Sequence, residues 1–454
     1  MTSADPPPAD GRRGRTFRYE GYEIDPAAGR LTCRYSLDGR DFAEVVTFPG
    51  GGRWDDPAVD EAARWVFLLA GVSYYKTAAP PVVELPHTPL RPGEVELLRR
   101  FHLDGLGEFA HRNGLDLSDL RIEAPALDPE PPPATGEPSA AARPLVPFGG
   151  GIDSIVTVEL VRPVAEPALF VVSRPGDRFA AIERPAAVTG LPVVRAERAI
   201  DPQVLRSREL GFLNGHVPVT GIVSAIAVMA AALEGRDAVV MSNEWSSSVA
   251  TLEVDGRAIN HQWSKGIDFE RLFRGALARS VGPGIDYFSR LRPYTELFIA
   301  ERFSHLGAYH RAFQSCNRGF HIDPAQRLDR WCGRCDKCAF VDLILSPFMS
   351  RDDLAAVFDG REPLDDLDLL PRFEGLVDTS GALKPWECVG EVGECRAAVA
   401  LAVQRADRAG SPVLRALADQ LGDRLPGPDD IAALLVPIGE HFVPDAYAAG
   451  APLG

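Results

Sequence analysis

The chain has 454 residues, which suggests two or three domains. Its 64 acidic and 48 basic residues give a formal net charge of -16, which excludes a general nucleic-acid-coating surface. A hydrophobic content of 45% is ordinary for a globular protein. The apolar stretch 221–233 is too short for a membrane span, which needs ~20 residues.

The first third of the chain predicts a tail followed by a small domain. Residues 1–16 are polar and proline-rich, which predicts a disordered tail. Residues 17–122 mix strand and helix patterns, so we expect a small α+β domain there. Its expected elements are a strand at 17–22, a hairpin turn at Asp38-Gly39, a helix at 57–69 and a helix at 93–113 that Gly114 closes.

A proline-rich segment at 123–143 predicts an extended linker, because proline fixes φ and removes a hydrogen-bond donor. Residues 144–350 then predict an α/β domain with a doubly wound parallel sheet. Residues 351–454 are mainly helical in pattern. The expected strands of the sheet are the apolar runs 145–148, 168–172, 191–194 and 238–241, with an alanine-rich helix at 219–233 before the last run.

Three consecutive glycines, Gly149, Gly150 and Gly151, follow the first of these runs and precede a helix-like segment. Glycines at a strand-to-helix turn let the backbone approach a ligand, and the helix start presents N–H groups suited to phosphate. Ser154 can add a hydroxyl, and Asp153 can hold a Mg²⁺ that bridges phosphate oxygens. A glycine-rich turn without a ligand is the plainer interpretation.

The sequence Gly149-Gly150-Gly151-Ile152-Asp153-Ser154 resembles the Ser-Gly-Gly-x-Asp-Ser loop of the PP-loop ATP pyrophosphatases, with Gly149 in place of the first serine. The resemblance implies a PP-loop sheet domain. It also implies that ATP is split between its α- and β-phosphates, that a substrate oxygen is adenylated and that pyrophosphate is released.

A cysteine cluster is the second chemical motif. Cys332, Cys335 and Cys338 are separated by two residues each, and Cys316 lies upstream. Four thiolates complete a tetrahedral Zn²⁺ shell, which favours a structural zinc site. Reduced cysteines without metal and an iron–sulfur cluster are the alternatives. The chain holds seven cysteines, an odd number that suits a reducing cytoplasm better than a disulfide scaffold.

Further segments point to one family. The cysteine arrangement is similar to that of the 7-cyano-7-deazaguanine synthases, and 291–297 looks like their helix leading to the zinc site. From about residue 17 to about 400, however, the chain more strongly resembles the MurL family of UDP-N-acetyl-α-D-muramoyl-L-alanyl-L-glutamate epimerases. The segments that carry this resemblance, besides the glycine turn and the cysteines, are 71–76, 214–220, 241–244, 260–265 and 384–391.

The resemblance implies an isomerase of peptidoglycan synthesis that inverts the terminal L-glutamate of UDP-N-acetylmuramoyl-L-alanyl-L-glutamate, using ATP and Mg²⁺. Inversion needs groups on both faces of the stereocentre, and candidates for them are His216, Glu244, His261, Lys265 and Cys388. Each also has a structural interpretation, as a capping, core or surface residue. Anionic substrate groups need cations, for which the candidates are Lys76, Arg174, Arg292 and Arg318.

Two other functions fit the same motifs. The first is an ATP-dependent ligase or amidating enzyme of the PP-loop type, related to 7-cyano-7-deazaguanine synthase. The second is a nucleotide-binding regulatory protein without turnover. The expected partners are small molecules, with neither nucleic acid nor membrane among them, and the oligomeric state is open.

Overall fold

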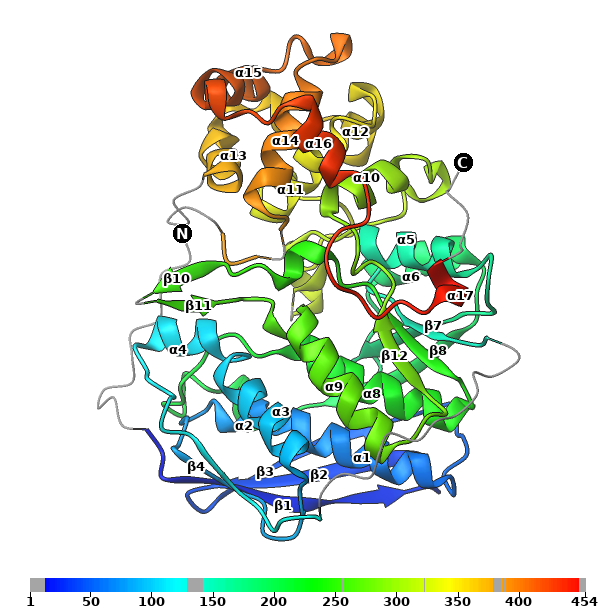
Figure 1. The fold of residues 1–454 in the computed structure, drawn as a ribbon, viewed down its shortest axis with the longest axis vertical. Coiled ribbons are helices and arrows are strands. Elements are labelled where there is room, and N and C mark those ends of the chain that lie inside the picture. The colour runs from blue at the N-terminus through cyan, green and yellow to red at the C-terminus, as the bar shows by residue number, and fades with distance from the viewer. Residues whose placement is uncertain are drawn as a thin grey trace.

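The computed structural model describes residues 13–128, 142–254, 256–321, 323–378, 385–387 and 389–448. Most of the expected tail, the larger part of the expected linker and Cys388 lie outside these residues. The last tail residues are already ordered: Arg13 donates to Ala79 O at 2.6 Å, and Thr16 begins the first strand. Strands β1–β4 lie at one end of the long axis and the C-terminal helices at the other (Figure 1).

Ten strands form one mixed sheet in the order β12-β9-β6-β7-β8-β3-β2-β1-β4-β5. Polar and apolar residues alternate in the first three strands, and β2 and β3 turn at Asp38-Gly39 as the sequence predicts. The strands are β1 (Thr16–Asp25), β2 (Arg30–Leu37), β3 (Arg40–Thr47), β4 (Val82–Glu84), β5 (Arg121–Glu123), β6 (Leu145–Pro147), β7 (Ala168–Ser173), β8 (Val193–Ala199), β9 (Ala238–Met241) and β12 (Asp286–Ser289).

The strands β12, β9, β6, β7 and β8 are parallel, and they include all four apolar runs that the sequence analysis expects as strands. The chain enters at β6, continues outward to β7 and β8, and then crosses to β9 on the other side of β6. The winding direction therefore reverses between β6 and β9. Ligands of open α/β sheets bind beyond the carboxyl ends of the strands at such a point.

The two halves of the sheet join through an antiparallel pair, in which Val45 of β3 lies opposite Ala199 of β8. The hydrogen bonds that join them connect backbone segments far apart in the sequence, so no local pattern predicts the junction. A two-stranded sheet, β10 (Leu252–Val254) and β11 (Arg257–Ile259), stands apart.

The parallel strands are covered on both faces. Val146 and Val240 pack into one hydrophobic core, while their neighbours Leu145 and Val239 pack into the other. Two short 3₁₀ helices, η1 (Trp245–Ser248) and η2 (Trp263–Lys265), follow β9. The helices up to the cysteine cluster are α1 (Pro57–Ala70), α2 (Val72–Tyr75), α3 (Pro92–Leu103), α4 (Gly107–Asn113), α5 (Ile152–Val161), α6 (Ala180–Thr189), α7 (Pro202–Leu205), α8 (Val219–Glu234), α9 (Ile267–Ser280) and α10 (Glu296–Ser304).

Two helix predictions need correction. The expected helix at 93–113 is two helices, α3 and α4, because the chain turns at Gly105, where a Cβ would lie 2.9 Å from Pro218 Cγ. The segment 291–297 is mostly a turn, and α10 begins only at Glu296, with the Thr295 hydroxyl accepting from Phe298 N at 3.1 Å. The left-handed cap at Gly114 is confirmed, with φ of 62°.

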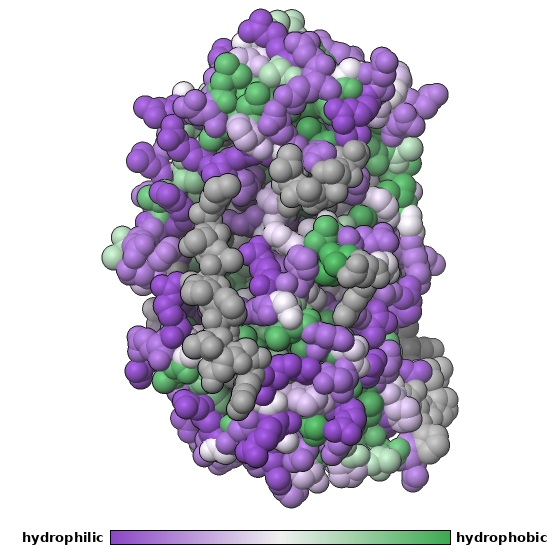
Figure 2. Space-filling view, turned by 90° about the vertical axis from the view of Figure 1, so that its left-hand side faces the viewer, coloured by the Kyte–Doolittle hydropathy of each residue, from purple (hydrophilic) through white to green (hydrophobic). Residues whose placement is uncertain are grey.

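The C-terminal region is helical, as expected, and packs against the hydrophobic core that contains Val146 and Val240. Its helices are α11 (Asp336–Leu345), α12 (Arg351–Val357), α13 (Leu370–Val377), α14 (Val392–Ala402), α15 (Pro412–Leu421), α16 (Pro428–Leu434) and α17 (Asp445–Ala448). One face of the molecule carries mostly hydrophilic residues, with hydrophobic ones in small groups (Figure 2). Among the described residues, no helix has the length and apolar character of a membrane span.

Candidate functional site

The glycine turn lies between the end of β6 and the start of α5. Gly150 has φ of 76°, and a Cβ there would lie 2.3 Å from Ala181 O, so this position requires glycine. A Cβ on Gly149 would meet nothing within 4 Å. The N-cap residue Gly151 offers no side chain to the first turn of α5, so the N–H groups there are available to a ligand.

A cavity of about 410 Å³ opens at this turn, at the point where the winding direction of the sheet reverses. Its wall includes Gly149, Gly151 and Asp153 from the turn and the first turn of α5. Ser154 also lines it, but its hydroxyl donates to Gly151 O at 3.0 Å and so braces the turn. Other polar lining residues are Ser242, Asn243, Lys265, Glu296, Ser315 and Lys337.

Three carboxylates meet beside the turn. Oxygens of Asp153, Glu244 and Glu296 lie within 4.8 Å of one another. Burial and the Glu244 carboxylate raise the pKa of Asp153 to about 6, against the pull of Lys337 and Lys265. Burial and the carboxylates of Asp153 and Glu244 raise the pKa of Glu296 well above its ordinary value. Such a group favours binding of a cation.

Glu244 reaches this group because it follows β9 by three residues, at the carboxyl end of the strand next to β6. The sequence predicts it as an acid/base group, and the structure places it with Asp153, beside the glycine turn. Glu296 begins α10, where an acidic residue also complements the helix dipole.

Arg292 holds the surrounding backbone in place. It is 1% exposed, and its guanidinium donates to Glu270 Oε2 at 2.9 Å and to Glu244 O at 2.7 Å. It also donates to the backbone oxygen of Lys265. Of the two interpretations of Arg292, substrate cation or salt-bridge residue, the structure supports the second: its charge is matched by Glu270, and it fixes the two segments that carry Glu244 and Lys265.

A second cluster contains both predicted histidines. His261 Nδ1 contacts Glu108 Oε2 directly, and His216 Nδ1 lies 3.8 Å from the same oxygen. The two imidazole rings are 4.4 Å apart between centroids. The other oxygen of Glu108 accepts from Arg112 Nε at 2.6 Å. The carboxylate thus orients the His261 ring, as in carboxylate–histidine pairs that transfer protons, and His216 lies beside this pair.

The cluster is electrostatically distinct from ordinary surface histidines. Burial and the neighbouring His261, followed by the charges of Lys76 and Lys265, lower the pKa of His216 to about 4. Burial, the largest single effect, raises the pKa of Glu108, but the hydrogen bond and charge of His261, with the charges of His216 and Arg112, together hold the pKa below its ordinary value. At neutral pH, His216 is therefore a neutral imidazole next to a carboxylate.

Lys76 lies next to His216, at the end of α2. Its ammonium donates to Asn214 Oδ1 at 2.9 Å and to Gly215 O at 3.0 Å. Burial lowers the pKa of Lys76 to about 8. Lys76 does not line the cavity, and its role as a substrate-binding cation stays a prediction. Arg318 is exposed, and neither it nor Arg174 is among the residues that line the cavity.

Lys265 connects the two clusters. Its side chain lines the cavity, and its charge lowers the pKa of both Asp153 and His216. His261 and Lys265 do not occupy one turn of an α-helix, because only 263–265 form a short 3₁₀ helix. The carboxylates and the histidines are therefore within electrostatic reach of one lysine.

Residues 385–387 extend from the histidines to the cysteines. The Trp386 ring lies 6.4 Å from that of His261 between centroids, and the Arg112 guanidinium lies 5.5 Å from it. The neighbouring Glu387 accepts a hydrogen bond from Nδ2 of Asn317 at 2.8 Å. Asn317 directly follows Cys316 in the sequence. Cys388, the fifth acid/base candidate, lies outside the described residues.

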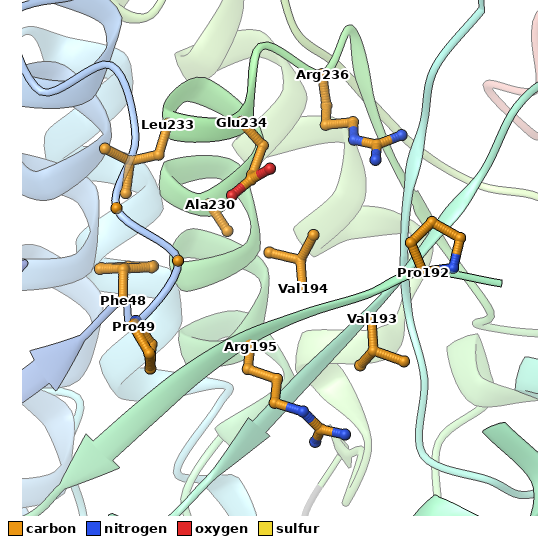
Figure 3. A pocket seen from close by; sticks show the side chains of 12 residues that line it. Phe48, Pro49, Pro192, Val193, Val194, Arg195, Ala230, Leu233, Glu234 and Arg236 are labelled. Carbon is orange, nitrogen blue, oxygen red and sulfur yellow. The ribbon is translucent and has the colours of Figure 1, made fainter. Parts of the chain in front are cut away.

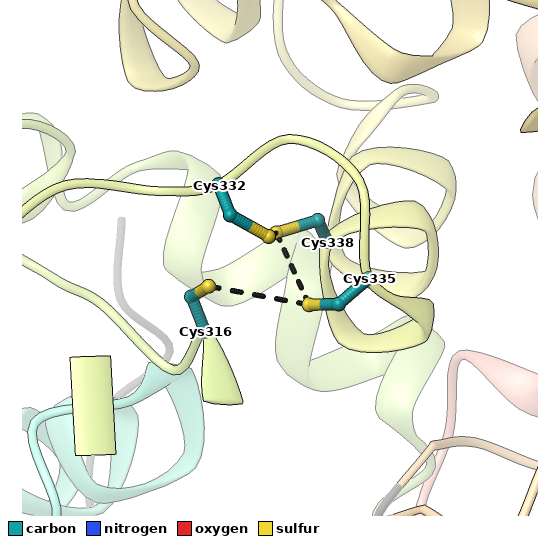
Figure 4. A group of neighbouring side chains, drawn as sticks. All are labelled: Cys316, Cys332, Cys335 and Cys338. Atoms are coloured by element: carbon teal, nitrogen blue, oxygen red, sulfur yellow. Dashed lines mark hydrogen bonds between the residues drawn. The ribbon is translucent and has the colours of Figure 1, made fainter. Parts of the chain in front are cut away.

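The four predicted cysteines do converge (Figure 4), with all four sulfurs within 4.8 Å of one another. The measured Sγ–Sγ distances are 4.0 Å for Cys316–Cys335, 3.6 Å for Cys332–Cys338 and 3.4 Å for Cys335–Cys338. A tetrahedral shell with Zn–S bonds of about 2.3 Å places sulfurs ~3.8 Å apart. The cluster could therefore hold a metal ion.

The cysteine cluster also positions part of the cavity wall. Ser315 immediately precedes Cys316, and Lys337 stands between Cys335 and Cys338. Both Ser315 and Lys337 line the cavity. A metal bound by the cysteines would therefore fix two residues of the site without touching the ligand.

A separate cavity of about 440 Å³ lies at the opposite end of the parallel strands (Figure 3). It is lined by Val193 and Val194 at the start of β8 and by the end of α8. Its Arg195 is paired with Glu183 at 2.8 Å. None of the predicted site residues lines this cavity, so we place the functional site at the glycine turn.

Sequence reasoning missed Glu108, Glu296 and Lys337. The local pattern shows Glu108 only as an ion-pair partner of Arg112, because the histidines it contacts lie more than one hundred residues away along the chain. Glu296 stands inside a segment quoted for its resemblance, and Lys337 stands inside the cysteine motif. A rule that examines charged residues within such motifs would have found the last two.

Family models and curated relatives match nearly the whole chain. The model of the MurL N-terminal domain matches residues 9–290, and that of the MurL C-terminal domain matches residues 312–430. Three curated relatives carry the name UDP-N-acetyl-alpha-D-muramoyl-L-alanyl-L-glutamate epimerase. No solved structure matches the chain significantly.

The relatives are similar in length to this chain. The protein of Salinispora tropica is 41% identical over 447 residues, which cover 96% of this chain and 95% of the relative. That of Micromonospora sp. is 39% identical over 96% of this chain and 98% of its own length. That of Xanthomonas oryzae pv. oryzae is 37% identical over 95% of both chains.

Proposed function

The chain belongs to the MurL family, and from this membership we propose that it inverts the terminal L-glutamate of UDP-N-acetylmuramoyl-L-alanyl-L-glutamate to D-glutamate. The reaction is an isomerisation that serves peptidoglycan synthesis. We further propose that ATP drives it through an acyl-adenylate. The observation that carries this second step is the glycine turn, which opens into a cavity lined by Asp153, Lys265 and Lys337.

Activation has a clear physical purpose. The Cα–H beside an ionised carboxylate is a very weak acid, because its loss places a second negative charge on a small fragment. A carboxylate oxygen of the substrate attacks the α-phosphorus of ATP and expels pyrophosphate. The resulting mixed anhydride has no carboxylate charge, and its carbonyl accepts the enolate charge. Water then releases AMP and restores the carboxylate.

The residues at the turn fit a triphosphate. The open side of Gly149, the uncapped N-terminus of α5 and the lysines Lys265 and Lys337 provide N–H groups and positive charge around one cavity. Asp153 would hold Mg²⁺, which neutralises phosphate charge when bound. Ser154 keeps the turn in shape through its bond to Gly151 O.

Proton transfer falls to the residues farther from the turn. Glu108 orients His261, and His216 lies beside this pair, so that a neutral imidazole faces the substrate as one acid/base group. Lys265, which lies between the carboxylates and the histidines, is our candidate for the group on the other face. Lys76, held by Asn214, would contact an anionic group of the substrate.

The experiment follows hydrogen exchange and nucleotide turnover together. The protein is incubated in D₂O with ATP, Mg²⁺ and the UDP-linked L-alanyl-L-glutamate substrate. We expect deuterium at the glutamate Cα of a D-configured product, together with AMP and pyrophosphate. AMP without deuterium would support a ligase in place of an epimerase. Epimerisation at full rate without ATP would disprove the adenylate step while leaving the isomerase assignment intact.

A further inference from the structure

In the cluster of Asp153, Glu244 and Glu296, a Mg²⁺ that Asp153 holds only together with phosphate does not explain the other two carboxylates. Glu244 is 3% exposed and Glu296 is 6% exposed, so two carboxylates are buried beside a third. Burying like charges together is costly unless a cation joins them. Phosphate, being anionic, would increase this repulsion.

An independent observation concerns Glu244 Oε2. This oxygen is buried and has no hydrogen-bond partner among the described residues. Buried carboxylate oxygens are normally satisfied, so an unsatisfied one inside an acidic group indicates a missing ligand. Because Glu244 has a carboxylate oxygen within 4.8 Å of oxygens of Asp153 and Glu296, we infer that this ligand is a cation.

The spacing suits a hard divalent ion. The three oxygens lie within 4.8 Å of one another. Oxygens on opposite sides of an ion with bonds of about 2.1–2.4 Å lie ~4.2–4.8 Å apart. Asp153 and Glu296 line the cavity, so positions on the ion remain open to water or to phosphate oxygens.

We propose that Asp153, Glu244 and Glu296 form a resident divalent-cation site, which binds Mg²⁺ or Mn²⁺ in the protein before any nucleotide enters. Glu244 is then a metal ligand, whereas the sequence analysis took it as an acid/base group. The inference rests on the proposed function only for the role of the ion, which is to receive the triphosphate. Ion binding itself can be measured without ATP or substrate.

The test titrates Mn²⁺ into the nucleotide-free full-length protein and follows the electron paramagnetic resonance signal of free Mn²⁺. We expect about one ion bound per chain. Glu244→Gln and Glu296→Gln preserve size and remove one charged ligand each, so each should weaken binding about tenfold or more. Glu301→Gln is the matched control, because Glu301 also lies on α10 but pairs with Arg302 at 3.2 Å.

Thermal unfolding provides the second readout. Mn²⁺ should raise the melting temperature of the wild type and of Glu301→Gln, but not that of Glu244→Gln or Glu296→Gln. Without the ion, the two Gln variants should melt no lower than the wild type, because a buried repulsion is removed. Binding that appears only when ATP is present, or binding unchanged in both variants, would overturn the proposal. Failure of the epimerase assay with intact Mn²⁺ binding would instead overturn the proposed function.

Discussion

Two places along the sheet, the β3–β8 junction and the end of β6, bury their charges in opposite ways. At the junction, the fully buried Glu44 receives both arms of the Arg198 guanidinium at 2.8 and 2.9 Å. Tyr74 OH donates to the same carboxylate at 2.9 Å. At the end of β6, by contrast, carboxylates adjoin other carboxylates, and Glu244 Oε2 has no partner in the described part of the chain.

The difference distinguishes charged residues that stabilise the fold from charged residues that are available to bind a ligand. A buried Arg–Glu pair with saturated hydrogen bonds holds two segments together, and nothing is left over to bind a ligand. A buried group of like charges destabilises the fold unless something else binds there, so it persists where it has another use. The segment 71–76 illustrates both cases: Tyr74 supports the Glu44–Arg198 pair, whereas the charge of Lys76 lowers the pKa of His216.

The largest expected effect tests the functional half of this comparison. Asp153→Ala should lower AMP formation about a thousandfold or more, because it removes the carboxylate at the phosphate end of the cavity. The free energy of unfolding should change by less than ~1 kcal/mol, since losing the attraction of Lys337 and Lys265 is offset by relief of burial and of the repulsion from Glu244. Steady-state AMP release and urea unfolding measure the two quantities. A variant that loses both activity and stability would show that Asp153 is architectural.

The cysteine cluster should stabilise the fold and also hold two residues of the site in place. Cys335→Ser should lower metal content and reduce the free energy of unfolding by ~5 kcal/mol, because metal binding is coupled to folding. Activity should fall as well, since Ser315 and Lys337 are fixed by the cluster. Elemental analysis and thermal unfolding are the measurements. An inactive variant that is well folded and retains all its metal would contradict the structural role.

Breaking the Glu44–Arg198 pair should lower the free energy of unfolding without changing catalysis. Arg198→Met leaves Glu44 buried without its cation, which should cost about 3–5 kcal/mol of unfolding free energy. Because the pair is outside the cavity, the KM and kcat of the folded fraction should stay near wild type. The double variant Arg198→Met/Glu44→Gln is the control and should recover part of the loss. If kcat fell in proportion to the free energy of unfolding, the Glu44–Arg198 pair would not be purely structural, and it would no longer differ from the carboxylates at the end of β6.

The sequence predicts those parts of the molecule that depend on neighbouring residues. The glycine turn, the hairpin at Asp38-Gly39 and the cysteine spacing are contiguous patterns, and all three have the expected local form. The β3–β8 junction was not predictable, because strand pairing between distant segments depends on tertiary packing. The same reason explains why His261 was found but its partner Glu108 was not.

The smallest expected effect concerns His216. Its ordinary pKa of 6.5 is lowered to about 4 in the folded protein, chiefly by burial. Between these values the unfolded chain binds the proton more readily, so the folded state loses stability as pH falls from 6.5 toward 4. His216→Gln removes this loss. The unfolding free energy of the variant relative to wild type should therefore rise by on the order of 2 kcal/mol across this interval.

Urea unfolding at several pH values measures this difference. His305→Gln is the matched control, because His305 is 49% exposed and should follow the wild-type curve. Curves for His216→Gln and wild type that stay parallel down to pH 4 would mean that the buried imidazole is not held neutral. His216 would then resemble the surface histidine, and the histidine cluster would no longer differ from the paired charges elsewhere in the fold.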